Sequence, residues 1–271
     1  MANAPASPAM TPPEDIAHTV SATCVSKATL PAGAMVGLGL LAGAYIGVGS
    51  LMAALLGAGT ADLPYGMAQL VAGIGFAVGL ILVLLAGAEL FTGNTLMTLP
   101  LAQRRIGVGQ LLRAWCVVWL ANLIGALVLV LLAIGAGVHL AGDGAVAASA
   151  IELAADKAGK PATTILASGV LANMLVCLAV WMAAGATSAV DKVAVIVPPI
   201  AAFVALGLEH SVANMSLLPL GLLAAHASDA ALPADLGWAA AGANLLWSTL
   251  GNIIGGAVIG LGYWAIHLRD S

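Results

Sequence analysis

The chain has 271 residues, of which 62% are hydrophobic and only 7% are charged, with a formal net charge of −4. A soluble domain carries about 25% charged residues, so this composition excludes one. Its 33 glycines suit helices that pack closely in lipid. We therefore expect an all-α membrane protein. The three cysteines are scattered and no basic patch is present, so we expect no metal, no cofactor and no nucleic-acid partner.

The N-terminal region, residues 1–28, is expected to be a tail followed by a short helix. No apolar core follows a basic start, so no signal peptide is predicted. Thr11 to Glu14 resemble a capping box, and Ile16, Val20 and Cys24 recur every four residues. This spacing predicts an amphipathic helix on the membrane face. We hypothesise that it gates the cytoplasmic mouth.

Six hydrophobic segments follow, each long enough for a bilayer that needs about 20 apolar residues. They cover approximately Leu30–Gly57, Pro64–Leu101, Leu111–Val138, Ala162–Ala186, Val190–Ala225 and Leu236–His267. The second is expected to break at Glu89 to Asn94 and the fifth at Glu209 to Asn214. Together they form one domain, residues 29–268, before a short tail, 269–271.

Basic residues flank these segments unequally. With a cytoplasmic N-terminus, the inside regions hold Lys27, Arg104, Arg105, Arg113, Lys192 and Arg269, and the outside loops hold only Lys157 and Lys160. Inner loops of membrane proteins carry an excess of Lys and Arg. We therefore expect both termini on the cytoplasmic side of a bacterial inner membrane.

The two halves of the chain also resemble each other. WLANLIGA at 119–126 matches TLGNIIGG at 249–256, and each half has one broken segment with Glu and Asn five residues apart. Three plus three segments place the two repeats, about 29–138 and 161–268, in opposite orientation. The ridge Gly39, Gly43, Gly47 could pack within a protomer or between protomers.

Ionisable side chains inside membrane segments are candidate functional sites. His210 could be a neutral core histidine or a pore histidine that donates hydrogen bonds. Glu89 and Glu209 are better explained as acceptors for backbone N–H groups freed by each break than as substrate contacts. Thr92 offers a hydroxyl at the first break.

Other residues near the breaks admit two interpretations. Asn94, Asn173 and Asn214 could bond to substrate or to freed backbone. The apolar side chains there could be ordinary packing or constrictions that exclude hydrated ions; they are Phe76, Leu80, Leu90, Phe91 and Phe203. Lys157 stands in an outside loop of mixed charge, where it could be solvated or concentrate anions at a pore mouth.

At these residues the chain resembles the formate/nitrite transporter family from Leu30 to Trp264. The motifs are AGAELFTGN at 86–94, WLANLIGA at 119–126, GVLANMLVCLAVWMA at 169–183, LEHSVANM at 208–215 and NLLWSTLGNIIGGA at 244–257. The resemblance implies an aquaporin-like fold, a homopentamer with one pore in each protomer, and small monovalent anions such as formate, nitrite or hydrosulfide as substrates. ELFTGN and LEHSVANM are most similar to the nitrite channel branch. Met174 departs from the family, in which many members have a tryptophan.

Carried over by motif, the family's pore histidine falls on His210, its loop threonine on Thr92 and its pore asparagine on Asn173. The vestibule lysine falls on Lys157. The resemblance also places the hydrophobic constrictions at the five apolar side chains named above, Phe76, Leu80, Leu90, Phe91 and Phe203.

Two routes for the anion stay open. Protonation at or near His210 could give a neutral acid that passes the apolar gates, or the anion could pass with His210 and Thr92 as hydrogen-bond donors. The predicted substrate is nitrite, with formate or another small monocarboxylate as the alternative. A different class is a signalling or scaffold protein of this fold that does not conduct. No HExxH, GxSxG or P-loop motif favours an enzyme.

Overall fold

The computed structural model describes residues 10–60 and 62–269. Predictions for residues 1–9 of the N-terminal tail and for 270–271 of the C-terminal tail lie outside these ranges. The elements are α1 (Pro13–Ala28), α2 (Ala32–Gly57), α3 (Tyr65–Ala86), α4 (Phe91–Asn94), η1 (Thr95–Met97), α5 (Thr98–Ala102), α6 (Val108–Gly135), η2 (Val138–Leu140), α7 (Ala145–Ala158), α8 (Ala162–Gly185), α9 (Ala189–Ala205), α10 (Ser211–Ala227), α11 (Trp238–Tyr263) and the π-helical turn η3 (Trp264–Leu268).

Prolines set where four of the helices begin. Pro12, Pro31, Pro64 and Pro161 occupy the N-cap positions of α1, α2, α3 and α8. Proline lacks an N–H and cannot continue a preceding helix, but the first turn of a helix does not need that donor. The polar connections therefore end at these prolines and the apolar helices start directly after them.

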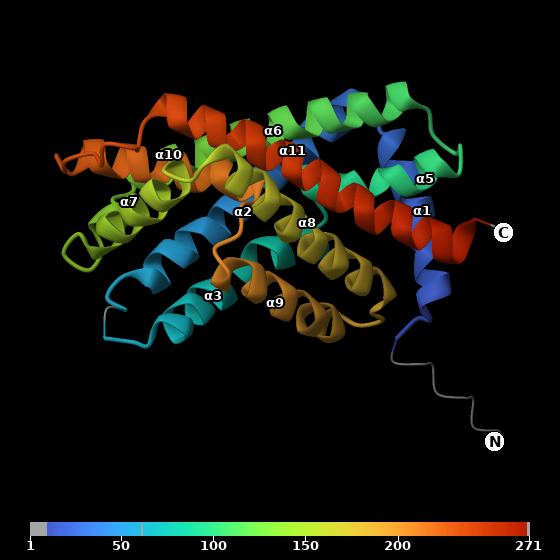
Figure 1. Cartoon of the computed structure of the whole chain (residues 1–271), viewed down its shortest axis with the longest axis horizontal. Helices are drawn as coiled ribbons and strands as arrows, with labels where there is room; N and C mark the ends of the chain where they lie inside the picture. The colour runs from blue at the N-terminus through green and yellow to red at the C-terminus, as the bar shows by residue number, and fades with distance from the viewer. Residues whose placement is uncertain (1–9, 61, 270–271) are drawn as a thin grey trace, which may run out of the picture.

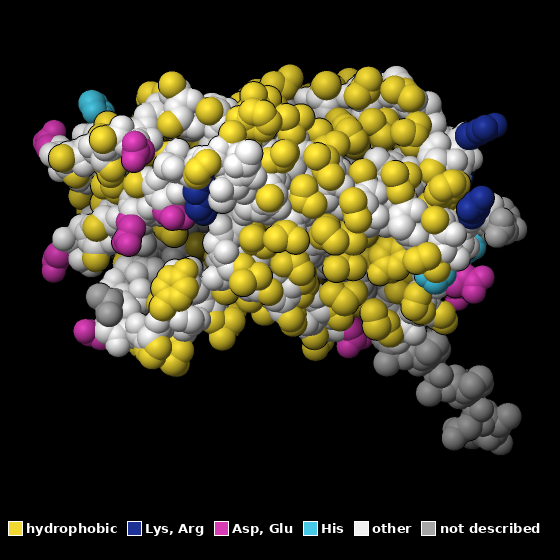
Figure 2. All heavy atoms as spheres, in the orientation of Figure 1, with side chains coloured by type: hydrophobic (Ala, Val, Ile, Leu, Met, Phe, Trp, Pro, Cys, Tyr) yellow, Lys and Arg dark blue, Asp and Glu magenta, His cyan; other side chains and the backbone are white. Residues whose placement is uncertain are grey.

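The predicted all-helical membrane architecture is confirmed. Within the described ranges, α2, α3, α6, α8 and the α11–η3 unit are long and apolar enough to cross a membrane. The fifth segment is divided into α9 and α10, each of 17 residues. Figure 2 shows apolar side chains covering the middle of the molecule, with charged side chains gathered at its two ends. This distribution matches a hydrocarbon layer between two aqueous faces.

The breaks lie earlier in the chain than the sequence predicts. The predicted ranges were 89–94 and 209–214, but regular helix resumes at Phe91 and at Ser211, so the irregular residues are 87–90 and 206–210. Gly87 (φ 81°) and Gly207 (φ 64°) end the preceding helices in a left-handed region that favours glycine. Asn94 and Asn214 therefore lie in helical turns beyond the breaks.

Helix α7 corrects the expectation of a simple outside loop. The charged residues among its 14 residues led to the prediction of a solvated loop. In the structure, Val146, Ala150 and Ala154 are buried on one face of the helix. That face packs on α10. Lys157 therefore projects from the last turn of a helix.

The inverted repeat extends to this helix. Lys27 and Lys157, Pro31 and Pro161, and Asn122 and Asn252 are all 130 positions apart. Helix α1 therefore corresponds to α7, and the two lie at opposite ends of the molecule, with both ends of the described chain on the α1 side (Figure 1). Such a placement is what two repeats of opposite orientation require.

Glycines bring the helices of each repeat into close contact. The ridge Gly39, Gly43, Gly47 faces α6 of the same chain, and a Cβ added at Gly43 would lie 2.0 Å from the carbonyl oxygen of Asn122. In the second repeat, a Cβ at Gly255 would lie 2.2 Å from the carbonyl oxygen of Val170. The ridge thus packs within the protomer, and its small residues permit backbone contact between helices.

Candidate functional site: a histidine–threonine pair between two cavities

The two broken segments meet at His210 and Thr92. His210 Nε2 lies 2.8 Å from the Thr92 hydroxyl oxygen. Thr92 is fully buried and His210 is 2% exposed. The two breaks, 118 positions apart, thus place their polar side chains in one hydrogen bond in the interior of the molecule.

The hydrogen bonds of His210 fix its tautomer. The backbone N–H of Ala213 donates to His210 Nδ1 over 3.0 Å, which caps the start of α10. Since a backbone N–H can only donate, Nδ1 carries a lone pair and the proton of the neutral ring lies on Nε2. Nε2–H then donates to Thr92, whose own hydroxyl hydrogen remains available for another acceptor. Protonating Nδ1 would break the cap and place positive charge at the N-terminus of α10.

A cavity of about 310 Å³ approaches the pair from the α7 side. Phe76 and Phe203 line it and contact each other edge to face, with ring centroids 5.4 Å apart. The Phe203 ring also lies 5.7 Å from the imidazole of His210. Phe203 therefore contacts the histidine and lines the cavity, and Phe76 packs against Phe203 there.

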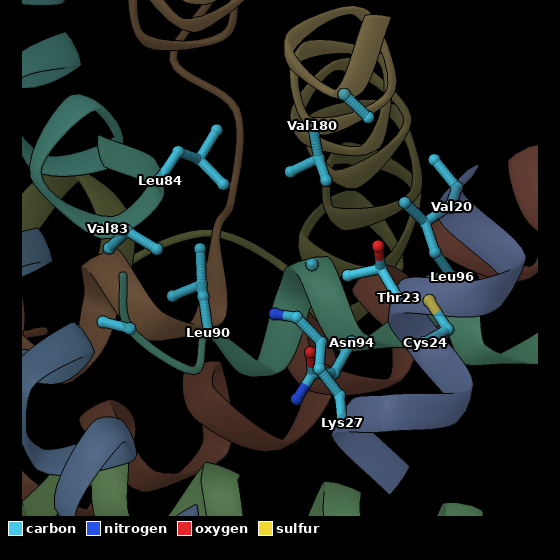
Figure 3. A pocket seen from close by; sticks show the side chains of 13 residues that line it. Val20, Thr23, Cys24, Lys27, Val83, Leu84, Leu90, Asn94, Leu96 and Val180 are labelled. Atoms are coloured by element: carbon cyan, nitrogen blue, oxygen red, sulfur yellow. The ribbon is translucent and has the colours of Figure 1, made fainter. Parts of the chain in front are cut away.

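A smaller cavity of about 70 Å³ lies on the α1 side. Leu90, Asn94 and Lys27 line it together with Thr23 and Cys24 of α1 (Figure 3). Neither His210 nor Thr92 lines this cavity or the larger one. The polar pair therefore occupies the closed stretch between the two cavities.

The remaining predicted constriction residues lie differently. Phe91 packs edge-on against Trp115, with centroids 6.2 Å apart, and Leu80 is 1% exposed. Neither lines one of the two cavities. Of the five predicted constriction residues, Phe76 and Phe203 line the larger cavity and Leu90 lines the smaller one.

Glu209 is held by four donors, one each from α7, α10, α11 and the connection between α7 and α8. Its Oε1 accepts from Lys157 over 3.3 Å and from Lys160 over 2.9 Å. Its Oε2 accepts from Asn214 over 2.6 Å and from Asn244 over 3.2 Å. The carboxylate is fully buried, so these partners replace the water that an isolated charge would need.

The two lysines also bind the broken backbone. Lys157 donates to the carbonyl oxygen of Leu208 and Lys160 to that of Gly207. Burial alone would lower the pKa of Lys160, but the carboxylates of Glu209 and Asp156 outweigh it and raise that pKa above the ordinary lysine value. Lys160 is therefore a permanent cation beside the second break.

Glu89 has a sparser set of partners at the first break. Lys27 of α1 forms an ion pair with Oε1 over 3.0 Å, and Asn94 donates to Oε2 over 2.9 Å. The Lys27 side chain is 28% exposed, whereas that of Lys157 is 10% exposed. The first break is therefore held by fewer and more accessible groups than the second.

Asn173 and Asn214 bond to the protein and line neither cavity, whereas Asn94 bonds to Glu89 and also lines the smaller cavity. Asn173 Nδ2 lies 3.3 Å from the carbonyl oxygen of Thr92, 2.9 Å from the Thr95 hydroxyl and 2.6 Å from the carbonyl oxygen of Asn252. Asn214 bonds to Glu209 and Asn244. Of the predicted polar residues, the structure brings only Thr92 and His210 into direct side-chain contact between the cavities.

Among the described residues, both glutamates accept from lysine and asparagine side chains, and not from freed backbone N–H groups as the sequence predicted. The lysine partners were missed, although a signal for them was present. Lys27 and Lys157 each begin the same short motif, KATLPA at 27–32 and KAGKPA at 157–162. Lysines four residues before a helix-starting proline in each repeat predict equivalent contacts at the two faces. Lys160 has no such counterpart, because Leu30 occupies the matching position.

Comparison with known proteins decides the class. The family model described as formate/nitrite transporter matches residues 14–265. The chain belongs to the formate/nitrite transporter family. Members of this family are channels and transporters rather than enzymes, which agrees with the membrane helices described above. Within the described residues, no group of three or more His, Cys, Asp or Glu side chains could hold a metal ion.

Two curated members of the family show the range of relatives. The chain is 40% identical over 229 residues to the formate channel FocA of Escherichia coli (strain K12), covering 78% of this chain and 79% of that one. It is 39% identical over 236 residues to the nitrite transporter NirC of Salmonella typhimurium, covering 86% and 79%. Relatives named for both anions are thus of similar identity.

Two solved structures share the fold. One is described as a pentameric formate channel with formate bound, with a TM-score of 0.81, 35% identity and coverage of 88% of this chain and 98% of that one. The other is described as an FNT family ion channel, with a TM-score of 0.82, 36% identity and coverage of 93% and 98%.

Proposed function

We propose that this chain conducts a small monovalent anion through a pore that passes the His210–Thr92 pair. The observation that carries the proposal is the position of that pair between two cavities, with Phe203 on one side and Leu90 on the other. An anion that leaves water needs hydrogen-bond donors in place of hydration. The free hydroxyl hydrogen of Thr92, oriented by His210, is such a donor.

The cap on α10 favours one of the two routes left open by the sequence. A ring whose Nδ1 accepts from Ala213 stays neutral, so His210 does not serve as an imidazolium acid. The anion accepts a hydrogen bond from Thr92 and passes the apolar constrictions in that state. Any proton that accompanies it is acquired in a cavity, before the constriction.

For the substrate, we propose nitrite first, on the motifs ELFTGN and LEHSVANM. Formate is the second candidate, and the 40% identity to a formate channel supports it. Both are bent, planar monovalent anions with two oxygen acceptors, so the Thr92 hydroxyl can donate to either of them.

The assembly and orientation belong to the same proposal. We propose a homopentamer, because a structural neighbour is described as pentameric. The end that carries α1 faces the bacterial cytoplasm, since Arg105 and Arg113 lie close to that helix through Ser21 and the carbonyl oxygen of Leu30. Lys157 and the larger cavity then face outward.

Anion flux in proteoliposomes tests the function. Nitrite, formate and chloride would be compared at about pH 5.5 and about pH 7.5, on either side of the ordinary histidine range. Nitrite flux well above formate flux supports the first candidate, and the reverse order supports the second. Absence of flux for every anion, with normal assembly, would refute conduction and favour the non-conducting scaffold.

His210→Asn tests the role of the histidine. Asparagine is a good N-cap and can accept from Ala213, so α10 should still start correctly. The bond to Thr92 is lost. We expect lower nitrite or formate flux at both pH values, whereas unchanged flux with unchanged pH dependence would remove His210 from the mechanism.

A further inference from the structure

Two buried asparagines hold the two breaks in the same way. Asn122 Oδ1 accepts from the N–H of Phe91 over 2.9 Å, and its Nδ2 donates to the carbonyl oxygens of Glu89 over 2.9 Å and Gly39 over 2.8 Å. Two of these three backbone groups, the Glu89 carbonyl and the Phe91 N–H, lie on either side of a single residue, Leu90. The amide therefore fixes the backbone on both sides of that constriction residue.

The second repeat repeats this arrangement around the histidine. Asn252 Oδ1 accepts from the N–H of Ser211 over 2.8 Å, and its Nδ2 donates to the carbonyl oxygens of Glu209 over 3.0 Å and Gly169 over 2.8 Å. Both asparagines are fully buried. In this repeat, the residue between the two bonded backbone groups, the Glu209 carbonyl and the Ser211 N–H, is His210.

Asn252 has a further connection that leads to Thr92. Its backbone carbonyl oxygen accepts from Asn173 Nδ2, which also lies within hydrogen-bond distance of the Thr92 carbonyl oxygen and the Thr95 hydroxyl. Asn252 is thus tied directly to the backbone around His210 and, through Asn173, to the backbone of Thr92. A single residue of α11 connects both partners of the polar pair.

We propose that Asn252 is a positioning residue that sets the separation of His210 and Thr92, with Asn173 as its link to the first break. Asn122, the matched residue of the other repeat, positions the Leu90 constriction instead. This inference rests on the proposed function for its consequence in transport. The geometric part, the maintenance of the His210–Thr92 hydrogen bond, can be measured without transport.

The direct test observes the ring N–H of His210 in protein labelled with ¹⁵N-histidine and reconstituted in lipid. In the parent protein, the buried Nε2–H should give a resonance protected from solvent exchange, and Thr92→Val should shift it and so assign it. Asn252→Ala should shift or remove the same resonance. Asn122→Ala should leave it in place, because the hydrogen bonds of Asn122 surround Leu90.

Asn173→Ala covers the case in which Asn252→Ala fails to assemble. It leaves the hydrogen bonds of the Asn252 side chain to Ser211 and Glu209 intact. It removes the contacts of Asn173 with the Thr92 and Asn252 carbonyl oxygens and with the Thr95 hydroxyl. We expect the His210 resonance to shift in this variant also. A parental resonance in correctly assembled Asn173→Ala and Asn252→Ala proteins would overturn the proposal, as would an equal shift in Asn122→Ala.

Flux then tests the consequence. Anion flux should fall at least about tenfold in Asn252→Ala, since misplacing a donor by a fraction of an ångström is costly. Combining that substitution with Thr92→Val should cause little further loss, because both disrupt the same hydrogen bond. Additive losses would overturn the proposal. If the parent protein shows the protected resonance but no anion flux, the proposed function fails while the positioning role stands.

Discussion

Trp119 donates a hydrogen bond from its indole Nε1 to the hydroxyl of Thr249 over 3.1 Å. These residues are 130 positions apart, the same offset that relates Asn122 to Asn252. A residue can touch its own counterpart only near the axis that relates the two repeats. The pseudo-twofold axis therefore passes between α6 and α11 close to this bond.

Thr92→Val removes the hydroxyl and retains a similar shape. Since a hydrogen bond to a charged group contributes about 1.5–3 kcal/mol, flux of nitrite or formate should fall by about tenfold or more. Initial rates in proteoliposomes give the measurement. Thr92→Ser restores the hydroxyl and should recover most of the rate; failure of serine to do so would indicate that packing, not hydrogen bonding, limits the valine variant.

Glu209→Gln should destabilise the protein more than Glu89→Gln. The first change leaves Lys157 and Lys160 without their shared buried counter-charge, which should lower the free energy of unfolding by about 3 kcal/mol. In the second, the partly exposed Lys27 can turn toward water, so the loss should be about 1 kcal/mol or less. Unfolding of the detergent-solubilised proteins compares them, and equal losses would contradict the difference between the breaks.

Lys160→Leu introduces the residue that the first repeat has at position 30. Losing this cation should raise the KM for anions entering from the α7 side by about threefold, with little change in maximal rate. The carboxylates of Glu209 and Asp156 raise the folded-state pKa of Lys160 above 10.5 despite its burial. The stabilisation of the folded protein by this ion pair is therefore complete below the unfolded-state pKa and is lost only as the pH rises through the folded-state pKa. The KM change should therefore be the same at about pH 5.5 and about pH 7.5. Lys192→Leu, a charge-matched change in α9, is the control; an equal effect there would indicate a nonspecific loss of charge.

The reactivity of the Cys24 thiol indicates whether α1 stays packed against the rest of the protein. Burial raises the pKa of its thiol to about 12, from an ordinary value of 9.0, which lowers the reactive thiolate fraction about a thousandfold. Ser21 on the same helix bonds to Gln103 and Arg105 beside α5. In a background without the other two cysteines, Ser21→Ala combined with Arg105→Ala should accelerate maleimide labelling of Cys24. An unchanged labelling rate would show that these bonds do not hold α1.

Composition and periodicity were enough to predict the helical class, because lipid permits few ways to satisfy the backbone of an apolar chain. The five-residue spacing of Glu and Asn located both breaks, since in each case the asparagine of the new helix bonds back to the glutamate. The exact start of each helix was not predictable from that spacing. It depends on Gly87 and Gly207 and, in the second break, on the imidazole cap of His210.

Contacts between distant segments were the part that the sequence did not reveal. Charges on 145–158 suggested a loop, because the burial of its small apolar face depends on the presence of α10. From the sequence, Asn173 could equally bond to substrate in the pore or to backbone groups freed by a break. Its three acceptors come from Thr92, Thr95 and Asn252, and only folding brings them together.

The two cavities also determine where an electric field acts. Space of about 310 Å³ and about 70 Å³ enters from opposite ends, so a membrane voltage falls mainly across the closed stretch between Phe203 and Leu90. One elementary charge that crosses the whole voltage exchanges about 2.3 kcal/mol per 100 mV, whereas a neutral acid exchanges none. The ratio of electrical current to anion flux therefore measures the charge of the species that passes His210.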